Sequence, residues 1–298
     1  MARTREILVC INRSSGGAAR GRRESNEVRR ALKAAGVSAK VMLLEGGEIT
    51  EVAKKAVKQG APLLIVGGGD GTVSAAASIL AGTKTALGVL PLGTLNHFAR
   101  DLGIPASLDE SAALIAKGQP RGIDVGEING RIFINNSAVG LYPLMVLDRE
   151  LQQQRLGRSK KLAMLVASAR TLVRFGHYRL ALTVNDQQAQ IDTPLLFVGN
   201  NDYRLDIGAP GHRESVEDGR LSVFVMRKKT RRGLVAASIR ALFNRSRPDD
   251  MVRIEDVQRL IVASRRSNLV ISLDGEVQSV KPPLDYRVRK GALKVIAP

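Results

Sequence analysis

The sequence is poor in the side chains that stack on bases and in those that react through sulfur. It has no tryptophan, four tyrosines and six phenylalanines among 298 residues. Sites for single-stranded nucleic acid combine basic residues with aromatic stacking platforms, so this shortage argues against a nucleic-acid partner. The single cysteine, Cys10, excludes a disulfide within the chain. Because Cys10 lies in an apolar run, we expect a buried, unreactive thiol.

Long hydrophobic runs are also missing. No apolar stretch approaches the roughly 18 residues that are needed to span a bilayer, and the first ten residues, MARTREILVC, lack the pattern of a secretory signal. We therefore expect a cytoplasmic protein. The three histidines, His97, His177 and His212, are scattered without the spacing of zinc ligands, so a zinc site is not predicted.

Acidic residues are scarce relative to basic ones. The chain has 28 Asp and Glu against 46 Lys and Arg, which gives a formal net charge of +18. A field of this sign concentrates anionic partners such as nucleic acid, nucleotides or acidic membrane surfaces, without selecting among them. Basic clusters occur at residues 20–23, 157–161, 227–232 and 244–248. Any one cluster is explained by a solvated face, but several together would hold an enzyme reversibly on anionic lipid.

The first 120 residues alternate between short apolar runs and helical patterns. Strands are expected at 6–12, 39–44, 61–66 and 85–90, and helices at 24–36, 48–60, 72–82 and 107–118. The stretch 13–22 is expected to be a loop. This alternation predicts a parallel sheet covered by helices on both faces, with ligands at the carboxyl ends of the strands. Both glycine-bearing loops, at 67–71 and 91–94, lie at such ends.

After Gly122 the pattern becomes strand-like, so we predict a doubly wound α/β domain at 1–121 and a β-rich domain at 122–298. The last residues are expected to pack on the first domain. Strands are predicted at 131–140, 178–184, 188–200, 221–226, 268–276 and 293–298. One insertion, 147–176, has apolar residues at helical spacing with Lys and Arg on the other face. Core packing and lipid contact are both compatible with this helix.

The stretch GGGDGT at 67–72 has the composition of a phosphate-binding loop. Consecutive glycines bring backbone N–H groups close to a ligand, and Thr72 is expected to open a helix with a positive N-terminus. The sequence is neither a Walker A loop nor a dinucleotide fingerprint. Asp70 would repel a bare phosphate, and a Mg²⁺ ion shared with substrate phosphates would remove this conflict. A tight turn without a ligand is the other interpretation, but three glycines are entropically costly for an ordinary turn.

Five motifs together resemble the diacylglycerol kinase catalytic family of soluble lipid kinases. They occupy residues 67–72, 91–105, 122–140, 215–225 and 273–276. The family is related to sphingosine and ceramide kinases, and shares GGDGT with NAD kinases. The resemblance covers essentially the whole chain. It implies an α/β nucleotide-binding domain and a β-sandwich-like domain, with the active site in the cleft between them.

The resemblance also implies the roles of individual residues. Glu276 is expected to be the general base, and Asp70 to belong to the magnesium and phosphate network, for which Asp124 is a further candidate. A structural metal is expected on Asp218 with the carbonyls of Ser215 and Arg220, although the residues alone favour a β-turn there. The expected nucleotide-binding residues are Asn12, Arg13, Ser14, Ser15, Gly16, Gly68, Gly69, Asp70, Gly71, Thr72 and Thr94.

The chain departs from the family pattern at four positions. Arg13 replaces a usual proline, Ser74 and Ala75 replace Asn and Glu, and His97 replaces Asp. The loss of these acids would reduce the carboxylate network near the magnesium.

The predicted function is transfer of the γ-phosphate of ATP to the hydroxyl of a diacylglycerol-like lipid, by a Mg²⁺-requiring kinase bound peripherally to an anionic membrane surface. An NAD kinase-like enzyme and a noncatalytic nucleotide-binding membrane-surface module are the alternatives. A homodimer is suggested only by analogy with relatives.

Overall fold

The structure is a computed structural model. It describes residues 7–13, 18–144, 146, 176–204, 212–213, 215–227, 230, 232–233 and 250–298. The chain divides into two compact units. Unit 1 comprises residues 1–125, 214–217 and 289–298, and unit 2 comprises residues 126–213 and 218–288. Strands β5 and β18 contribute residues to both units, so the chain passes between the units along two strands.

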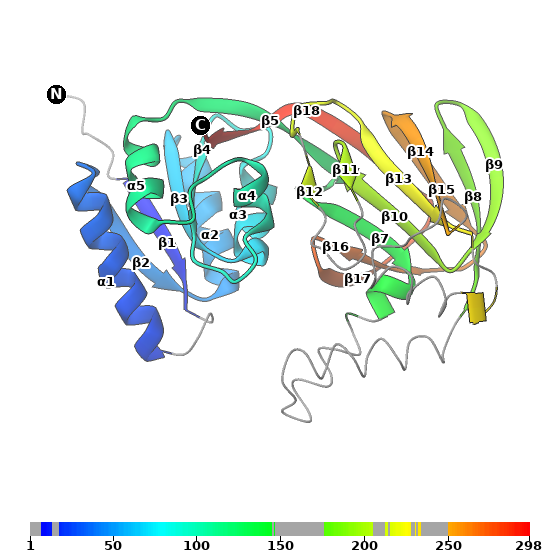
Figure 1. The fold of residues 1–298 in the computed structure, drawn as a ribbon, viewed down its shortest axis with the longest axis horizontal. Helices are drawn as coiled ribbons and strands as arrows, with labels where there is room; N and C mark the ends of the chain where they lie inside the picture. Colours follow the sequence, from blue (N-terminus) through cyan, green and yellow to red (C-terminus); the bar gives the residue numbers. More distant parts are fainter. Residues whose placement is uncertain are drawn as a thin grey trace. The chain divides into compact units, whose positions relative to one another are not determined.

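Unit 1 is a parallel α/β unit. Its sheet has the order β2-β1-β3-β4, and the C-terminal end of β18 pairs in parallel with β4. Helices cover both faces of the sheet, with α1 and α5 on one side and α2 and α3 on the other (Figure 1). The elements are β1 (Ile7–Asn12), α1 (Ala18–Ala34), β2 (Ala39–Leu44), α2 (Gly46–Lys58), β3 (Leu63–Gly68), α3 (Asp70–Leu80), β4 (Ala86–Pro91), α4 (His97–Asp101), α5 (Leu108–Lys117) and β5 (Pro120–Ile128).

Local signals explain most of the helix ends in unit 1. Glu45 and Glu48 form a capping box at the start of α2, and the hydroxyl of Ser107 accepts the N–H of Glu110 at the start of α5. Helix α1, however, begins at Ala18, inside the stretch that was expected to be a loop. Gly21 allows this early start, because there the helix comes close to Leu43 of β2, whose Cδ1 would lie 3.3 Å from an added Cβ.

The expected buried thiol is confirmed. Cys10 is fully buried in β1, and burial raises the pKa of its thiol to about 12. The thiol therefore stays protonated and a poor nucleophile at neutral pH.

Unit 2 is a β-sandwich of two antiparallel sheets. One sheet contains β6, β5, β18, β15, β8 and β9, and the other has the order β14-β13-β10-β7-β16-β17. The elements are β6 (Arg131–Phe133), β7 (Asn136–Gly140), β8 (Tyr178–Val184), β9 (Gln187–Thr193), β10 (Leu195–Asn200), β11 (Tyr203–Arg204), β12 (His212–Arg213), β13 (Leu221–Met226), β14 (Met251–Val257), β15 (Arg259–Ser264), β16 (Leu269–Leu273), β17 (Glu276–Val280) and β18 (Leu284–Ile296).

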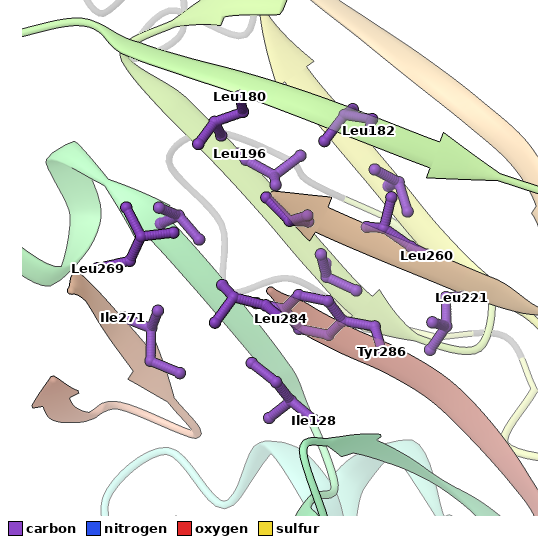
Figure 2. Close-up of a cluster of buried hydrophobic side chains, with 14 of the residues drawn as sticks. Ile128, Leu180, Leu182, Leu196, Leu221, Leu260, Leu269, Ile271, Leu284 and Tyr286 are labelled. Atoms are coloured by element: carbon purple, nitrogen blue, oxygen red, sulfur yellow. The ribbon is translucent and has the colours of Figure 1, made fainter. Parts of the chain in front are cut away.

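The core of unit 2 lies between these sheets. Leu180 and Leu182 of β8 are buried while Arg179 and Ala181 are exposed, the period of two that is typical of a half-buried strand. Leu180 and Leu182 belong to one buried cluster with residues of the facing sheet such as Leu196, which lies close to Leu180, and Ile271 (Figure 2). Tyr286 is fully buried in this cluster, and its hydroxyl lies 3.1 Å from that of Ser137. Burial raises the pKa of Tyr286, so the phenol stays neutral.

The predicted fold class, α/β followed by a β-sandwich-like part, is confirmed. Three of the expected strands are each divided. The run 268–276 contains β16, a two-residue turn and the first residue of β17. The run 131–140 forms β6 and β7, because the N–H groups of residues 134–136 donate to a carboxylate rather than to a neighbouring strand. The run 188–200 is divided at Pro194, which has no N–H to donate.

The amphipathic helix expected at 147–176 lies outside the described residues, apart from Gly176. Within the described ranges, no helix combines the length and the apolar character needed to cross a membrane.

The Tyr286 contacts predict a graded loss of stability. In Tyr286→Phe the ring remains and the hydrogen bond to Ser137 is lost, so the free energy of unfolding should fall by about 1 kcal/mol. In Tyr286→Ala the loss of the buried ring should cost about 3–5 kcal/mol. Urea unfolding measures both values. Equal losses in the two variants would show that ring packing contributes nothing beyond the hydrogen bond.

Candidate functional site

The carboxyl ends of three neighbouring strands in unit 1 meet at one edge of the sheet. Ile11 of β1 is level with Gly67 of β3, and Gly68 of β3 is level with Pro91 of β4. The loops that follow these strands contain the predicted nucleotide-binding residues. Parallel pairing therefore brings together segments that lie up to 80 residues apart in the sequence.

Asn12 and Thr72 connect the first two of these loops. The side-chain amide of Asn12, the last residue of β1, donates to the hydroxyl of Thr72 at 2.7 Å. Thr72 is buried in the first turn of α3. This helix begins at Asp70, two residues before the expected start, with Gly69 as its N-cap. The first N–H groups of α3 therefore lie at the same end as Asp70, as an anion-binding helix start requires.

Asp70 connects the second loop with the third. Its Oδ1 accepts the backbone N–H of Phe98 at 3.1 Å, across 28 residues of sequence. The described residues form no hydrogen bond or ion pair with Oδ2 of this half-buried carboxylate. One carboxylate oxygen beside a helix N-terminus fits a Mg²⁺ ion whose other ligands are waters and substrate phosphates.

The glycines of these loops allow close packing. An added Cβ on Gly68 would lie 2.8 Å from the side chain of Thr72, and one on Gly67 would lie 2.9 Å from Leu92. A Cβ on Gly93 would lie 2.4 Å from the Cα of Gly69. The second and third loops therefore touch backbone to backbone, and only a glycine fits at position 93 of this contact.

The third loop is held by Asn96 and leaves the next residues exposed. The Asn96 side chain accepts the N–H of Gly93 at 3.0 Å and donates to its carbonyl at 2.9 Å. Thr94 is exposed, and Leu95 is 60% exposed. At His97, Nδ1 lies 3.0 Å from the Arg100 guanidinium. Because arginine can only donate, this ring nitrogen acts as an acceptor.

The remaining predicted residues of unit 1 are placed differently. Arg13 is exposed at the end of β1, and its N–H donates to Leu44, while Ser14, Ser15 and Gly16 lie outside the described residues. Asp124 is 4% exposed on β5, and its Oδ1 accepts the N–H of Gly291 at 2.8 Å. This hydrogen bond joins β5 to β18 within unit 1, so Asp124 has a structural role.

In unit 2, Glu276 lies at the tip of the β16–β17 hairpin. It is the first residue of β17, it is exposed, and it is level with Leu273. The turn residues, Asp274 and Gly275, both have positive φ, 47° and 88°, as in the two-residue type I′ turn that Asp-Gly favours. Asp274 has no role among the residues predicted from the sequence, although the Asp-Gly pair before Glu276 is a signal for this turn.

The predicted structural metal site involves residues of both units. Ser215 belongs to unit 1, and Asp218 and Arg220 belong to unit 2. Oδ2 of Asp218 accepts the N–H of Asp202 at 3.1 Å, and Arg220 forms an ion pair with Asp256 at 3.3 Å. Among the described residues no three His, Cys, Asp or Glu side chains are grouped to bind a metal. The metal at Asp218 stays a prediction.

Two family models match the chain. The model described as "Diacylglycerol kinase catalytic domain" matches residues 6–128. The model described as "YegS C-terminal NAD kinase beta sandwich-like domain" matches residues 146–297.

Curated relatives and solved structures agree with these matches. A protein of Pseudomonas syringae pv. tomato named "Probable lipid kinase YegS-like" is 30% identical over 268 residues, which are 85% of this chain and 82% of that protein. A "Diacylglycerol kinase" of Bacillus subtilis is 39% identical over 105 residues, 34% of this chain and 35% of that protein. The crystal structure of a diacylglycerol kinase from Bacillus anthracis has a TM-score of 0.70 at 21% identity, and the match covers 98% of this chain and 97% of that one. This structure supports the fold.

The backbone contact between Gly69 and Gly93 predicts the effect of adding one methyl group. Gly93→Ala should lower the free energy of unfolding by about 1–3 kcal/mol, because the contacted backbone cannot move aside without strain. Gly47→Ala is the matched control, since an added Cβ meets nothing within 4 Å at this position in the first turn of α2. Urea unfolding of both variants measures the difference. If Gly93→Ala is as stable as Gly47→Ala, the loops are not in tight contact.

Proposed function

The chain belongs to the family of YegS-like lipid kinases, and from this premise we propose that it transfers the γ-phosphoryl group of ATP to the hydroxyl of a diacylglycerol-like lipid at a membrane surface. The observation that carries the proposal is the hydrogen-bonded assembly of three loops around Asp70. The assembly combines a helix start, glycine backbone and one carboxylate at the carboxyl edge of a parallel sheet.

Nucleotide binding is assigned to this edge of unit 1. The N–H groups of Asp70 and Gly71 at the start of α3 would contact phosphate oxygens, because the first N–H groups of a helix have no preceding turn to bind. Those of Thr72 and Val73 instead donate to the carbonyl of Gly69. Asn12 holds Thr72, and the Gly69–Gly93 contact keeps the backbone close to where the phosphates would lie. These residues bind and orient the triphosphate, and Thr94 would contribute from the third loop.

Asp70 is the residue that would hold Mg²⁺ together with the phosphates. When bound, the ion neutralises charge on the β- and γ-phosphates and polarises the transferred group. The N–H of Phe98 fixes the orientation of the carboxylate by binding Oδ1, so that Oδ2 keeps one direction. His97, next to Phe98, supplies no second acid there.

Glu276 is proposed to be the general base. Its carboxylate would take the proton of the lipid hydroxyl as the hydroxyl oxygen bonds to the γ-phosphorus and the bond from that phosphorus to the ADP oxygen breaks. The products are then a phosphorylated lipid and ADP, with the proton on Glu276. Phosphoryl transfer requires mainly positioning and charge neutralisation, so one carboxylate of this kind is sufficient.

The proposed membrane surface is supported by charge and by one exposed apolar side chain. The net charge of +18 attracts anionic lipid. Leu95 is exposed in the third loop, and the side chains of Arg13 and Arg100 are exposed in unit 1. Each basic residue near an anionic surface contributes about 1 kcal/mol, so a few of them would hold the enzyme there reversibly.

Substitution of Glu276 tests the assigned base. Glu276→Gln should lower kcat with ATP, Mg²⁺ and dispersed diacylglycerol by at least about 100-fold, because the amide cannot accept the proton. Nucleotide affinity, measured by titration calorimetry, should be unchanged. Glu255→Gln is the matched control, a 70% exposed glutamate of the same unit. Full turnover in Glu276→Gln would exclude this residue as the base.

A panel of acceptors tests the substrate class. We expect labelled phosphate from ATP to appear in diacylglycerol or a related lipid alcohol, with a higher rate on vesicles that contain anionic lipid. Transfer to NAD instead would support the NAD kinase alternative. Binding of ATP without transfer to any fraction of a lipid extract would support the noncatalytic module.

A further inference from the structure

Asp274 joins the Glu276 hairpin to a neighbouring segment of unit 2. Its carboxylate accepts the backbone N–H groups of Ile134, Asn135 and Asn136, at 2.8, 2.8 and 3.0 Å. Its own N–H donates to the carbonyl of Asn136 at 2.8 Å. The turn that precedes Glu276 is therefore attached to residues 134–136 by four hydrogen bonds, three of them to a charged acceptor, which are the stronger kind.

Arg213 holds the same segment through its carbonyl groups. This arginine is 4% exposed, and its guanidinium donates to the carbonyl of Ile134 and, at 3.1 Å, to the side-chain oxygen of Asn135. Asn200 adds two bonds, from its N–H to the carbonyl of Asn135 at 2.9 Å and from its amide to that of Ile134 at 3.2 Å. The segment thus presents its three N–H groups to an anion, and one backbone carbonyl and one side-chain oxygen to a cation.

The turn itself does not require an acid at position 274. Residues Asn129 and Gly130 form a two-residue turn between β5 and β6 with φ of 47° and 80°, nearly the values of Asp274 and Gly275. An asparagine therefore adopts this conformation in the same unit. What an aspartate adds is a charged acceptor that binds three N–H groups at once.

We propose that Asp274 is the positioning residue for Glu276, and that Arg213 supports it by holding Ile134 and Asn135 of the segment to which Asp274 binds. The inference rests on the proposed function, because it takes Glu276 as the base. Glu276 is two residues beyond Asp274 on a short turn, so a shift of the turn moves the carboxylate directly. A displacement of about 1 Å at a reacting group can cost about 100-fold in rate.

The test is Asp274→Asn in the full-length chain. The amide oxygen can still accept two N–H groups, but the amide nitrogen meets the third as another donor, so the turn should fold and lose its fixed position. We expect kcat for lipid phosphorylation to fall about 10- to 100-fold, with the KM for ATP unchanged. Asp186→Asn is the matched control, because Asp186 is exposed in the two-residue turn between β8 and β9. This control should leave kcat unchanged.

Combination with Glu276→Gln separates positioning from a general loss of folding. If Asp274 acts through Glu276, the double variant Asp274→Asn, Glu276→Gln should be no slower than Glu276→Gln alone. A further loss in the double variant, or a wild-type kcat in Asp274→Asn, would overturn the inference. If Glu276→Gln retains activity, Glu276 is not the base and Asp274 has no base to position. The failure of the proposed function is therefore distinguishable from the failure of this inference.

Arg213→Lys gives a second route if Asp274→Asn does not fold. Lysine keeps the positive charge but lacks the planar fork that reaches both Ile134 and Asn135. We expect kcat to fall less than in Asp274→Asn, with the KM for ATP unchanged. In the Glu276→Gln background, Arg213→Lys should cause no further fall in kcat. A variant with wild-type kcat, or with kcat and ATP affinity lowered together, would contradict the role of Arg213.

Discussion

The parallel pairing of β1, β3 and β4 is the constraint on which the candidate site depends. Parallel strands in register end at the same edge, so the loops that follow them must meet there. Hydrogen bonds then join the loops, because the Asn12 amide donates to Thr72 and the Asp70 carboxylate accepts the N–H of Phe98. A helix start and a carboxylate are placed together before any ligand arrives. This preorganisation reduces the ordering that binding would otherwise require.

In unit 2 the position of Glu276 depends on a turn and not on the register of parallel strands. In an antiparallel sandwich the side chains of the strands are either in the core or on a sheet surface, so a group at a strand end depends on its turn. The β16–β17 turn is short. The Asp274 carboxylate attaches it to residues 134–136, and Arg213 binds the same segment. Strands β6 and β7 are separate because the N–H groups of residues 134–136 bind the Asp274 carboxylate and not a neighbouring strand. The interruption of the expected strand and the support of the hairpin thus have one cause.

Most of the architecture could be predicted because it follows from local patterns. Apolar runs alternate with helical periods over the first 120 residues, and strand-like runs dominate after Gly122. The errors have physical reasons of two kinds. Helix α1 begins at Ala18, earlier than expected, and its Gly21 lies close to Leu43 of β2, a tertiary contact that propensity does not describe. The strand at 131–140 is divided because its N–H groups find a carboxylate that lies about 140 residues away in the sequence.

The amino-acid sequence by itself determined the two kinds of architecture and the glycine loop with its acid. These features depend on residue types at short spacing, where periodicity and turn chemistry act. Only the tertiary structure decided that Asp70 binds Phe98, that Asp124 binds Gly291, and that Asp274 faces residues 134–136. Hydrogen bonds between distant segments depend on sheet order and register. The residues next to a carboxylate in the sequence do not show which N–H groups it will bind.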